Sequence, residues 1–378
     1  MATPLAWLNL WHNKTRSLTA IAGVAFSAVL ILMQLGFFTA LQLSAVNVYA
    51  ELDFDIVLSS TAYRIFSRAG SFPLERLALS RSDPNVVNAA PFWIGLAGWL
   101  NEHKQPPTRR GILVMAERPG DQLFKLPAVR ATENLLSKTG SVLMDRASRP
   151  EFGPNEIGLV STVGQTRVQI AGQFLLGSGF SADGAIITSD ATFAELFPWF
   201  PANQTSLGLL KLREGADSSA VVAELRELLP PDVEVRTRAQ VMYDEEYFWR
   251  TKTSVGTIFL LGIFVGILVG TSIVYQVMSS DIGNRIGEFA TLKAMGYSSS
   301  YLTWNVLSQA AIIGVGGYLP AFFLSLFLYR ITEQQAHIPM RLGFVVGGGV
   351  FLLSLAMCIL SGLLSLRKVA QAAPADLF

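Results

Sequence analysis

The chain has little of what most enzymes need. Among its 378 residues there are one cysteine and three histidines. Cys358 has no partner within the chain, which excludes internal disulfides. His12, His103 and His337 are far apart in sequence, so we expect ordinary surface or interfacial residues rather than a metal site or a catalytic triad. The sequence also lacks the motifs Gly-x4-Gly-Lys-Ser/Thr, His-Glu-x-x-His and Gly-x-Ser-x-Gly. We therefore expect no enzyme activity and no cofactor in this chain.

Charge is also scarce. Charged residues make up 15% of the chain and hydrophobic residues 51%, whereas soluble domains carry about 25% charged residues. Segments without Asp, Glu, Lys, Arg or His are long enough to span a bilayer, which takes roughly 20 residues. We predict four transmembrane helices at 18–43, 253–279, 301–329 and 342–366. Because no span contains a charge, an ion pathway or a proton relay within the membrane is not expected.

The first apolar segment also resembles a secretory signal peptide. Val48-Tyr49-Ala50 even resembles a cleavage site. However, the apolar run is about twice as long as a signal-peptide core of about 7–15 residues. We therefore expect the first helix to be retained in the membrane.

Basic residues near the spans predict the orientation of the chain. Six Lys and Arg lie before the first span, between the second and third spans, and after the fourth, against two in the 330–341 loop. The excess of positive charge on the cytoplasmic side of membranes then places 1–17, an amphipathic N-terminal segment, in the cytoplasm. The 280–300 loop and the 367–378 tail lie on the same side. Residues 44–252 and the short 330–341 loop are expected outside.

Residues 44–252 are long enough for a folded domain with its own core. They carry 21 Lys and Arg against 24 Asp and Glu, and this balance argues against a nucleic-acid partner. The clearest local pattern is a strand over 207–212, a helix over 218–229 with Asp217 as N-cap, and a strand over 233–235. The sequence thus predicts an α-helical membrane protein with four transmembrane helices plus a large α+β extracytoplasmic domain between the first and second spans.

The two ends of this domain have patterns that differ from its centre. Uncharged residues continue past the first span, and aromatic residues at 243–249 precede the second. These patterns predict stalk helices that join the domain to the membrane. An aromatic belt at the membrane surface with an ordinary linker would give a similar pattern.

A charged and polar segment, Asp281–Ser300, separates the second and third spans. Its apolar residues recur at helical spacing, which predicts a short helix over 282–295, with Asp281 as N-cap and Gly296 in a left-handed conformation at its end. A short amphipathic helix can bind in a groove of a soluble partner. The candidate contact residues are Ile282, Arg285, Ile286, Glu288, Phe289, Leu292, Lys293 and Gly296.

Three glycines in the second span, Gly262, Gly266 and Gly270, form two overlapping Gly-x-x-x-Gly units. Such a helix face lets another helix approach closely. The partner helix can belong to the same chain or to a second copy, and the motif does not choose between them. Our hypothesis is that this face packs a dimer.

This order of elements resembles the MacB/FtsX-type permeases of ABC transporters. The stretch Asn13-Lys-Thr-Arg-Ser-Leu-Thr-Ala-Ile-Ala-Gly23 is similar to the family's approach to the first span. Arg285-Ile-Gly-Glu-Phe-Ala-Thr-Leu-Lys-Ala-Met-Gly296 is similar to its coupling-helix motif, and Pro374-Ala-Asp-Leu377 to its C-terminal motif.

Two shorter stretches, Ala290-Thr-Leu-Lys-Ala-Met-Gly-Tyr297 and Phe54-Asp-Ile-Val57, most resemble the DevC branch, which comprises permeases of cyanobacterial exporters. One departure is Ser308-Gln309-Ala310, which stands where many relatives carry Glu-Ala.

The resemblance implies a homodimer in the inner membrane of a bacterium, by the DevC likeness a cyanobacterium. The dimer would work with a separate ABC ATPase subunit that binds ATP and Mg²⁺. It also implies a periplasmic membrane-fusion adaptor and a TolC-like outer-membrane channel, with a lipid or glycolipid-like substrate. Such permeases transmit ATP-driven movement to the external domain without passing substrate between their spans. The alternative from another class is a membrane sensor with a ligand-binding periplasmic domain.

Overall fold

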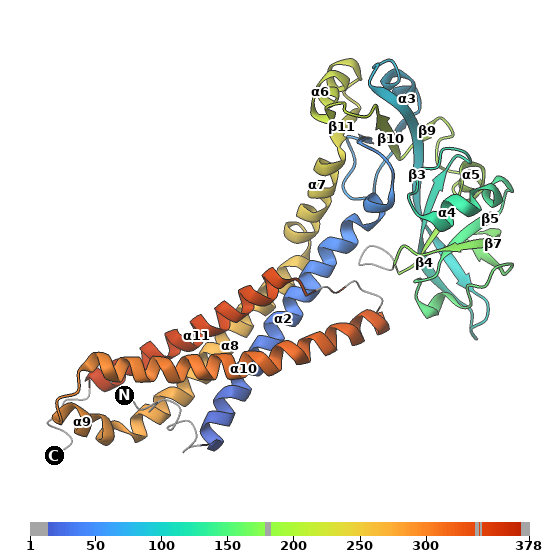
Figure 1. The fold of residues 1–378 in the computed structure, drawn as a ribbon. Coiled ribbons are helices and arrows are strands. Elements are labelled where there is room, and N and C mark those ends of the chain that lie inside the picture. Colours follow the sequence, from blue (N-terminus) through green and yellow to red (C-terminus); the bar gives the residue numbers. More distant parts are fainter. Residues whose placement is uncertain (1–13, 178–182, 337–339, 341, 372–378) are drawn as a thin grey trace. The chain divides into compact units, whose positions relative to one another are not determined.

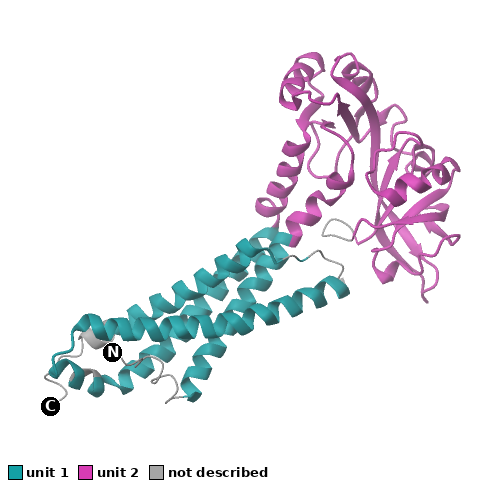
Figure 2. Cartoon of the chain, in the orientation of Figure 1, with its two compact units in different colours: residues 1–39, 254–335, 340–378 teal, residues 40–253, 336–339 magenta. Residues whose placement is uncertain are grey.

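A computed structural model describes the chain except for residues 1–13, 178–182, 337–339, 341 and 372–378. The described residues form two compact units (Figure 2). Residues 1–39, 254–335 and 340–378 make up the first, which we call the helical unit. Residues 40–253 and 336–339 make up the second, the α+β unit.

Each predicted span lies almost entirely within one of four long helices (Figure 1): α2 (Lys14–Glu51), α8 (Ser254–Asn284), α10 (Ser299–Ala336) and α11 (Phe344–Gln371). All four are long and apolar enough to cross a membrane, which confirms the predicted number of spans. The helices extend past the apolar stretches because backbone hydrogen bonds, rather than apolarity, decide where a helix ends. Because α10 runs to Ala336, the predicted 330–341 loop is shorter than expected.

The helical unit is held together by small residues and buried hydroxyl groups. Ser361 Oγ of α11 donates a hydrogen bond to the Thr271 carbonyl of α8 at 3.0 Å. Tyr318 of α10 donates to the Gly347 carbonyl of α11 at 2.7 Å. In lipid the hydrophobic effect does not drive helices together, so hydrogen bonds of this kind and close backbone packing stabilise their association.

The α+β unit contains a split β-α-β-β-α-β arrangement. Its strands are β1 (Ile56–Ser60), β3 (Val86–Asn101), β10 (Leu207–Leu212) and β11 (Val233–Thr237), in the antiparallel order β11-β1-β10-β3. Helices α3 (Glu75–Ser80) and α6 (Ser218–Leu228) join β1 to β3 and β10 to β11. Asp217 caps α6 through the Ser219 amide at 2.9 Å, so the predicted strand-helix-strand unit near 207–235 is confirmed.

A second lobe is inserted between β3 and β10. It consists of β4 (Thr108–Glu117), β5 (Ser141–Asp145), β6 (Val160–Val163), β7 (Thr166–Phe174) and β8 (Ala185–Ser189). The order β3-β4-β8-β5-β7-β6 closes on itself, because β6 pairs with β3 at Trp99–Val163 and Leu100–Thr162. The closed barrel is filled by alternate side chains of its strands, such as Trp99, Val114, Met144, Ile170 and Ile186.

Short elements complete the α+β unit. They are α4 (Pro127–Thr132), η1 (Glu133–Ser137), η2 (Pro150–Phe152), α5 (Asp190–Leu196), and the small β2 (Phe72–Pro73) and β9 (Gln204–Thr205) pair. The unit ends with α7 (Arg238–Thr251), which begins at a capping box formed by Thr237 and Gln240. Both predicted stalk regions are therefore helical. The first is a continuation of α2 to Glu51, whereas α7 is a helix separate from α8.

Candidate functional site

The 281–300 segment forms a corner followed by the short helix α9 (Ile286–Ala294), between α8 and α10 (Figure 1). Helix α8 continues through Asp281 to Asn284, and Arg285, with φ −108° and ψ 15°, separates it from α9. The predicted short helix is confirmed, but Asp281 is not its N-cap, because that residue belongs to the last turn of α8. Gly296 has φ +89°, the left-handed conformation predicted at the end of α9.

Part of the predicted contact set is buried in the helical unit. Ile282 is 3% exposed and belongs to one apolar cluster with Leu302 and Val306 of α10, against which Leu292 also packs. Arg285 is likewise buried and ion-paired with Asp281. The prediction that Ile282 and Arg285 contact a soluble partner is therefore wrong. The apolar stripe at helical spacing marks the side of the segment that faces its own helices.

The exposed side of the segment carries different residues. Glu288 and Lys293 are exposed, and Ile286 is half-buried. Beyond the helix end, Met295 is 63% exposed and Tyr297 is 46% exposed. The Phe289 side chain lies outside the described residues. Sequence reasoning missed Met295 and Tyr297, although large apolar residues beside a helix-ending glycine in a charged segment were a usable signal.

The glycine face of α8 is filled by α2 and, at Gly270, also by Met357 of α11, all from the same chain. A methyl group added at Gly262 would lie 2.5 Å from Cδ of Gln34, and one at Gly266 would lie 2.9 Å from Cγ1 of Ile31. At Gly270, an added methyl group would lie 2.8 Å from Cβ of Ser27. The prediction that this face packs a dimer is therefore wrong, because no room remains on it for a second copy.

Replacing Gly266 by Leu should destabilise the single chain. The larger side chain would push α2 away from α8, and overpacking typically costs about 1–3 kcal/mol. The measurement is thermal unfolding of the purified chain in detergent. Gly283→Leu is the matched control, because no described atom lies within 4 Å of a methyl group added there. Equal melting of the two variants would contradict the assigned packing.

The outward face of α8 differs from its glycine face. Ile258, Leu261, Val265 and Leu268 are 61%, 60%, 45% and 51% exposed, at alternating spacings of three and four residues. One turn further on, the exposed face becomes polar, and a surface hollow is lined by Ser272, Tyr275, Gln276, Ser279 and Ser280. Polar side chains on the surface of a spanning helix are costly in lipid without hydrogen-bond partners.

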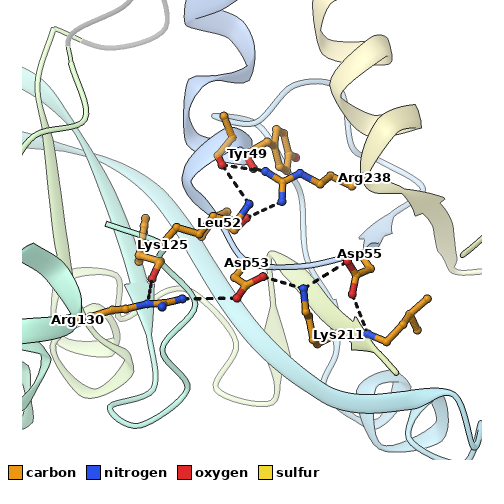
Figure 3. Close-up of polar contacts among 11 residues, drawn as sticks. Tyr49, Leu52, Asp53, Asp55, Lys125, Arg130, Lys211 and Arg238 are labelled. Atoms are coloured by element: carbon orange, nitrogen blue, oxygen red, sulfur yellow. Dashed lines mark hydrogen bonds and ion pairs between the residues drawn. The ribbon is translucent and has the colours of Figure 1, made fainter. Parts of the chain in front are cut away.

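In the α+β unit, the end of α2 is clamped by an arginine (Figure 3). Arg238, the first residue of α7, donates hydrogen bonds to the carbonyl oxygens of Tyr49, Ala50 and Leu52, at 2.9, 2.8 and 3.0 Å. The last carbonyl groups of a helix have no partner within the helix, and a cation there also complements the helix dipole. Arg238 thus joins α7 to the last turn of α2.

Charged residues fix the chain just after α2 (Figure 3). Lys211 of β10 lies 2.8 Å from Asp53 and 3.4 Å from Asp55, and Arg130 of α4 lies 3.5 Å from Asp53. The hydrogen bond from Lys211 lowers the pKa of Asp53 below its ordinary value. The exit of α2 is therefore tied to both lobes of the α+β unit. Half-exposed pairs of this kind contribute more to geometry than to stability.

A buried polar chain joins the same two helices. The Tyr49 hydroxyl of α2 lies 2.6 Å from that of Tyr63, and Tyr63 donates to Glu245 Oε1 of α7. The Arg236 guanidinium lies 4.6 Å from the centre of the Tyr63 ring. Burial raises the pKa of the Glu245 carboxyl to about 7. These hydrogen bonds link α2 to α7 through the Tyr63 hydroxyl.

Among the residues that the structure describes, no group of three or more His, Cys, Asp and Glu side chains could hold a metal ion.

Residues 260–374 match the FtsX-like permease C-terminal family. No curated protein sequence matches the chain significantly. The chain resembles the periplasmic region of MacB from Actinobacillus actinomycetemcomitans, with 12% identity and a TM-score of 0.37 over 52% of this chain and 94% of that one. It also resembles the extracellular domain of the noncanonic ABC-type transporter YknZ from Gram-positive bacteria, with 14% identity and a TM-score of 0.35 over 48% and 98%. The part of the chain that contains α9 and its flanking spans thus matches the FtsX-like permease C-terminal family.

Proposed function

We propose that the chain is the transmembrane subunit of an ABC-type exporter. The observation that carries this proposal is the match of residues 260–374 to the FtsX-like permease C-terminal family. Within that stretch, the 281–300 segment presents exposed charged side chains on α9 and exposed apolar side chains just beyond it. The chain lacks a nucleotide-binding motif, so ATP and Mg²⁺ would be bound by a separate ATPase subunit docked on α9.

The docking surface is the outward side of the 281–300 segment, made of Glu288, Lys293, Met295 and Tyr297. A flexible, apolar methionine beside a tyrosine suits an adaptable protein contact. The two charges would set the orientation of the partner more than its affinity. This surface keeps Glu288 and Lys293 of the predicted contact set, adds Met295 and Tyr297, and leaves out the buried Ile282 and Arg285.

Movement would reach the α+β unit along α2. This helix is uninterrupted from Lys14 to Glu51, and its last turn is bound by Arg238 of α7. A tilt of α2 would therefore displace both helices that enter the α+β unit. The expected work is mechanical, delivered to a substrate outside the membrane rather than between the spans.

A second copy of the chain would cover the outward face of α8. The spacing of Ile258, Leu261, Val265 and Leu268 fits a left-handed pairing with another helix. Serine and glutamine both donate and accept hydrogen bonds, so the polar end of this face can pair with itself across a two-fold axis.

Cysteine cross-linking tests this dimer. In a Cys358→Ser background, Leu268→Cys should form a disulfide between two copies in the membrane. Phe323→Cys, at a position 65% exposed on α10, is the matched control and should remain monomeric. Equal cross-linking at both positions would show random collision and remove the support for this interface.

The remaining assignments rest on the resemblance to the DevC branch. They are an inner membrane of a cyanobacterium, a periplasmic membrane-fusion adaptor, a TolC-like outer-membrane channel and a lipid or glycolipid-like substrate. Co-purification of the full-length chain, followed by mass spectrometry of proteins and lipids, tests the adaptor, the channel and the substrate class.

Labelling of a single cysteine tests the orientation on which the exporter depends. In the Cys358→Ser background, Ser298→Cys should react with a membrane-impermeant maleimide only after the cells are opened, because an ATPase docks from the cytoplasm. Labelling of Ser298→Cys from outside intact cells would place α9 away from ATP and overturn the proposed function.

A further inference from the structure

The corner between α8 and α9 holds a buried ion pair. Arg285 Nε lies 3.4 Å from Asp281 Oδ1, one helical turn earlier. The two side chains are only 8% and 19% exposed. Arg and Asp are seldom buried unless they are paired, because removing a charge from water is energetically unfavourable. The sequence therefore maintains a costly pair at the only residue that separates the two helices.

Asp281 lines a small cavity between three helices. A cavity of about 20 Å³ is lined by Asp281 of α8, Arg16 and Ser17 of α2, and Gln309 of α10. This volume is sufficient for one water molecule, and its walls offer polar partners. Gln309 is 4% exposed. The ion pair thus belongs to a polar cluster that reaches α2, α8 and α10 at the same level as the corner.

Arg285 alone lies between the last residue of α8 and the first residue of α9, so its conformation sets the angle between the two helices. The Arg285 amide donates a hydrogen bond to the Ile282 carbonyl at 3.1 Å. The planar guanidinium presents several donors in a fixed geometry, so it can fix direction in a way that a lysine ammonium cannot.

We infer that Asp281 and Arg285 are positioning residues, which hold α9 at one angle to the helical unit so that force on α9 moves α8. The inference deepens the proposed function, since it assumes that α9 receives that force. It concerns the angle of α9 rather than the docking surface, whose residues point outward.

Spin-label distances on the full-length chain test this role without an ATPase. Labels are placed at Thr291→Cys of α9 and at Trp304→Cys of α10, both exposed, in the Cys358→Ser background. Dilution with unlabelled chain removes distances between copies. The parent should give one narrow distance. Arg285→Met and the nearly isosteric Asp281→Asn should each lose it, and the double variant should be no worse than the worse single one, because both remove the same contact.

Two comparisons separate positioning from a general effect on folding. Lys293→Met removes an exposed cation from the same helix and should keep the narrow distance. Thermal unfolding of each variant identifies any that fails to fold, and Asp281→Asn preserves the side-chain volume. A parental distance in both Arg285→Met and Asp281→Asn would overturn the inference, as would an equal loss in Lys293→Met. Neither result depends on whether an ATPase binds, so failure of the proposed function would be seen separately.

Discussion

A chain that carries Glu288→Lys together with Met295→Asp should insert and fold like the parent but lose its ATPase partner. Both side chains are exposed, and Met295 is 63% exposed, so neither change disturbs the packing of the helical unit. Removing an apolar anchor from the centre of an interface costs about 2 kcal/mol or more. That alone weakens binding about 30-fold, and the reversed charge at Glu288 adds repulsion.

The measurement is association with the ABC ATPase that co-purifies with the parent chain, in membranes that hold equal amounts of each variant. Ile282→Ala is the informative control, because Ile282 is buried against α10. It should lower the unfolding temperature while the folded fraction still binds the ATPase. If the double variant binds like the parent, the surface of Glu288 and Met295 is not the docking element. If the parent itself binds no ATPase, a membrane sensor that signals without an ATPase becomes the better interpretation.

For the 281–300 segment, the prediction of a short helix was confirmed, and the prediction that Ile282 and Arg285 contact a partner was wrong. Apolar periodicity located the helix, because residues three and four apart share a face. Periodicity could not tell whether that face packs against helices of the same chain or against a partner protein. Ile282 satisfies the pattern equally well as an anchor for a partner or as part of the core, and the structure places it in the core. The glycines of α8 carry the same ambiguity, and the side chains of α2 resolve it.

The α+β unit was predictable where its contacts are local. Strands β10 and β11 and helix α6 lie within 31 residues, from Leu207 to Thr237, and Asp217 marks the start of the helix. The barrel was not predicted, because its closure depends on the pairing of Trp99 with Val163. Two strands so far apart in sequence can pair without any signal in the apolar and polar alternation of either strand. The role of Arg238 was missed for the same reason, since its partners lie in α2.

The buried Glu245 predicts an unusual pH dependence. Burial raises the pKa of its carboxyl from 4.5 to about 7 in the folded chain, so the folded state binds a proton that the unfolded state has released. Stability from this group is therefore fully present below pH 4.5 and is lost as the pH rises through about 7. The difference corresponds to about 3 kcal/mol at most. Glu117 of β4, whose pKa burial also raises to about 7, acts in the same direction.

We therefore expect the unfolding temperature of the full-length chain in detergent to fall between pH 5 and pH 8, by roughly 5–10 °C for a unit of this size. The lowered pKa of Asp53 has the opposite sign, but it acts below this range. Glu245→Gln should remove the contribution of Glu245 to this pH dependence and leave that of Glu117. The decrease of the unfolding temperature with pH should therefore become smaller without disappearing. Glu246→Gln, the next residue of α7, should keep the parental slope. A parental slope in Glu245→Gln, or stability that rises with pH, would show that the carboxylate is accommodated in its ionised form. The junction of α2 and α7 would then be held by a permanent charge rather than by a proton.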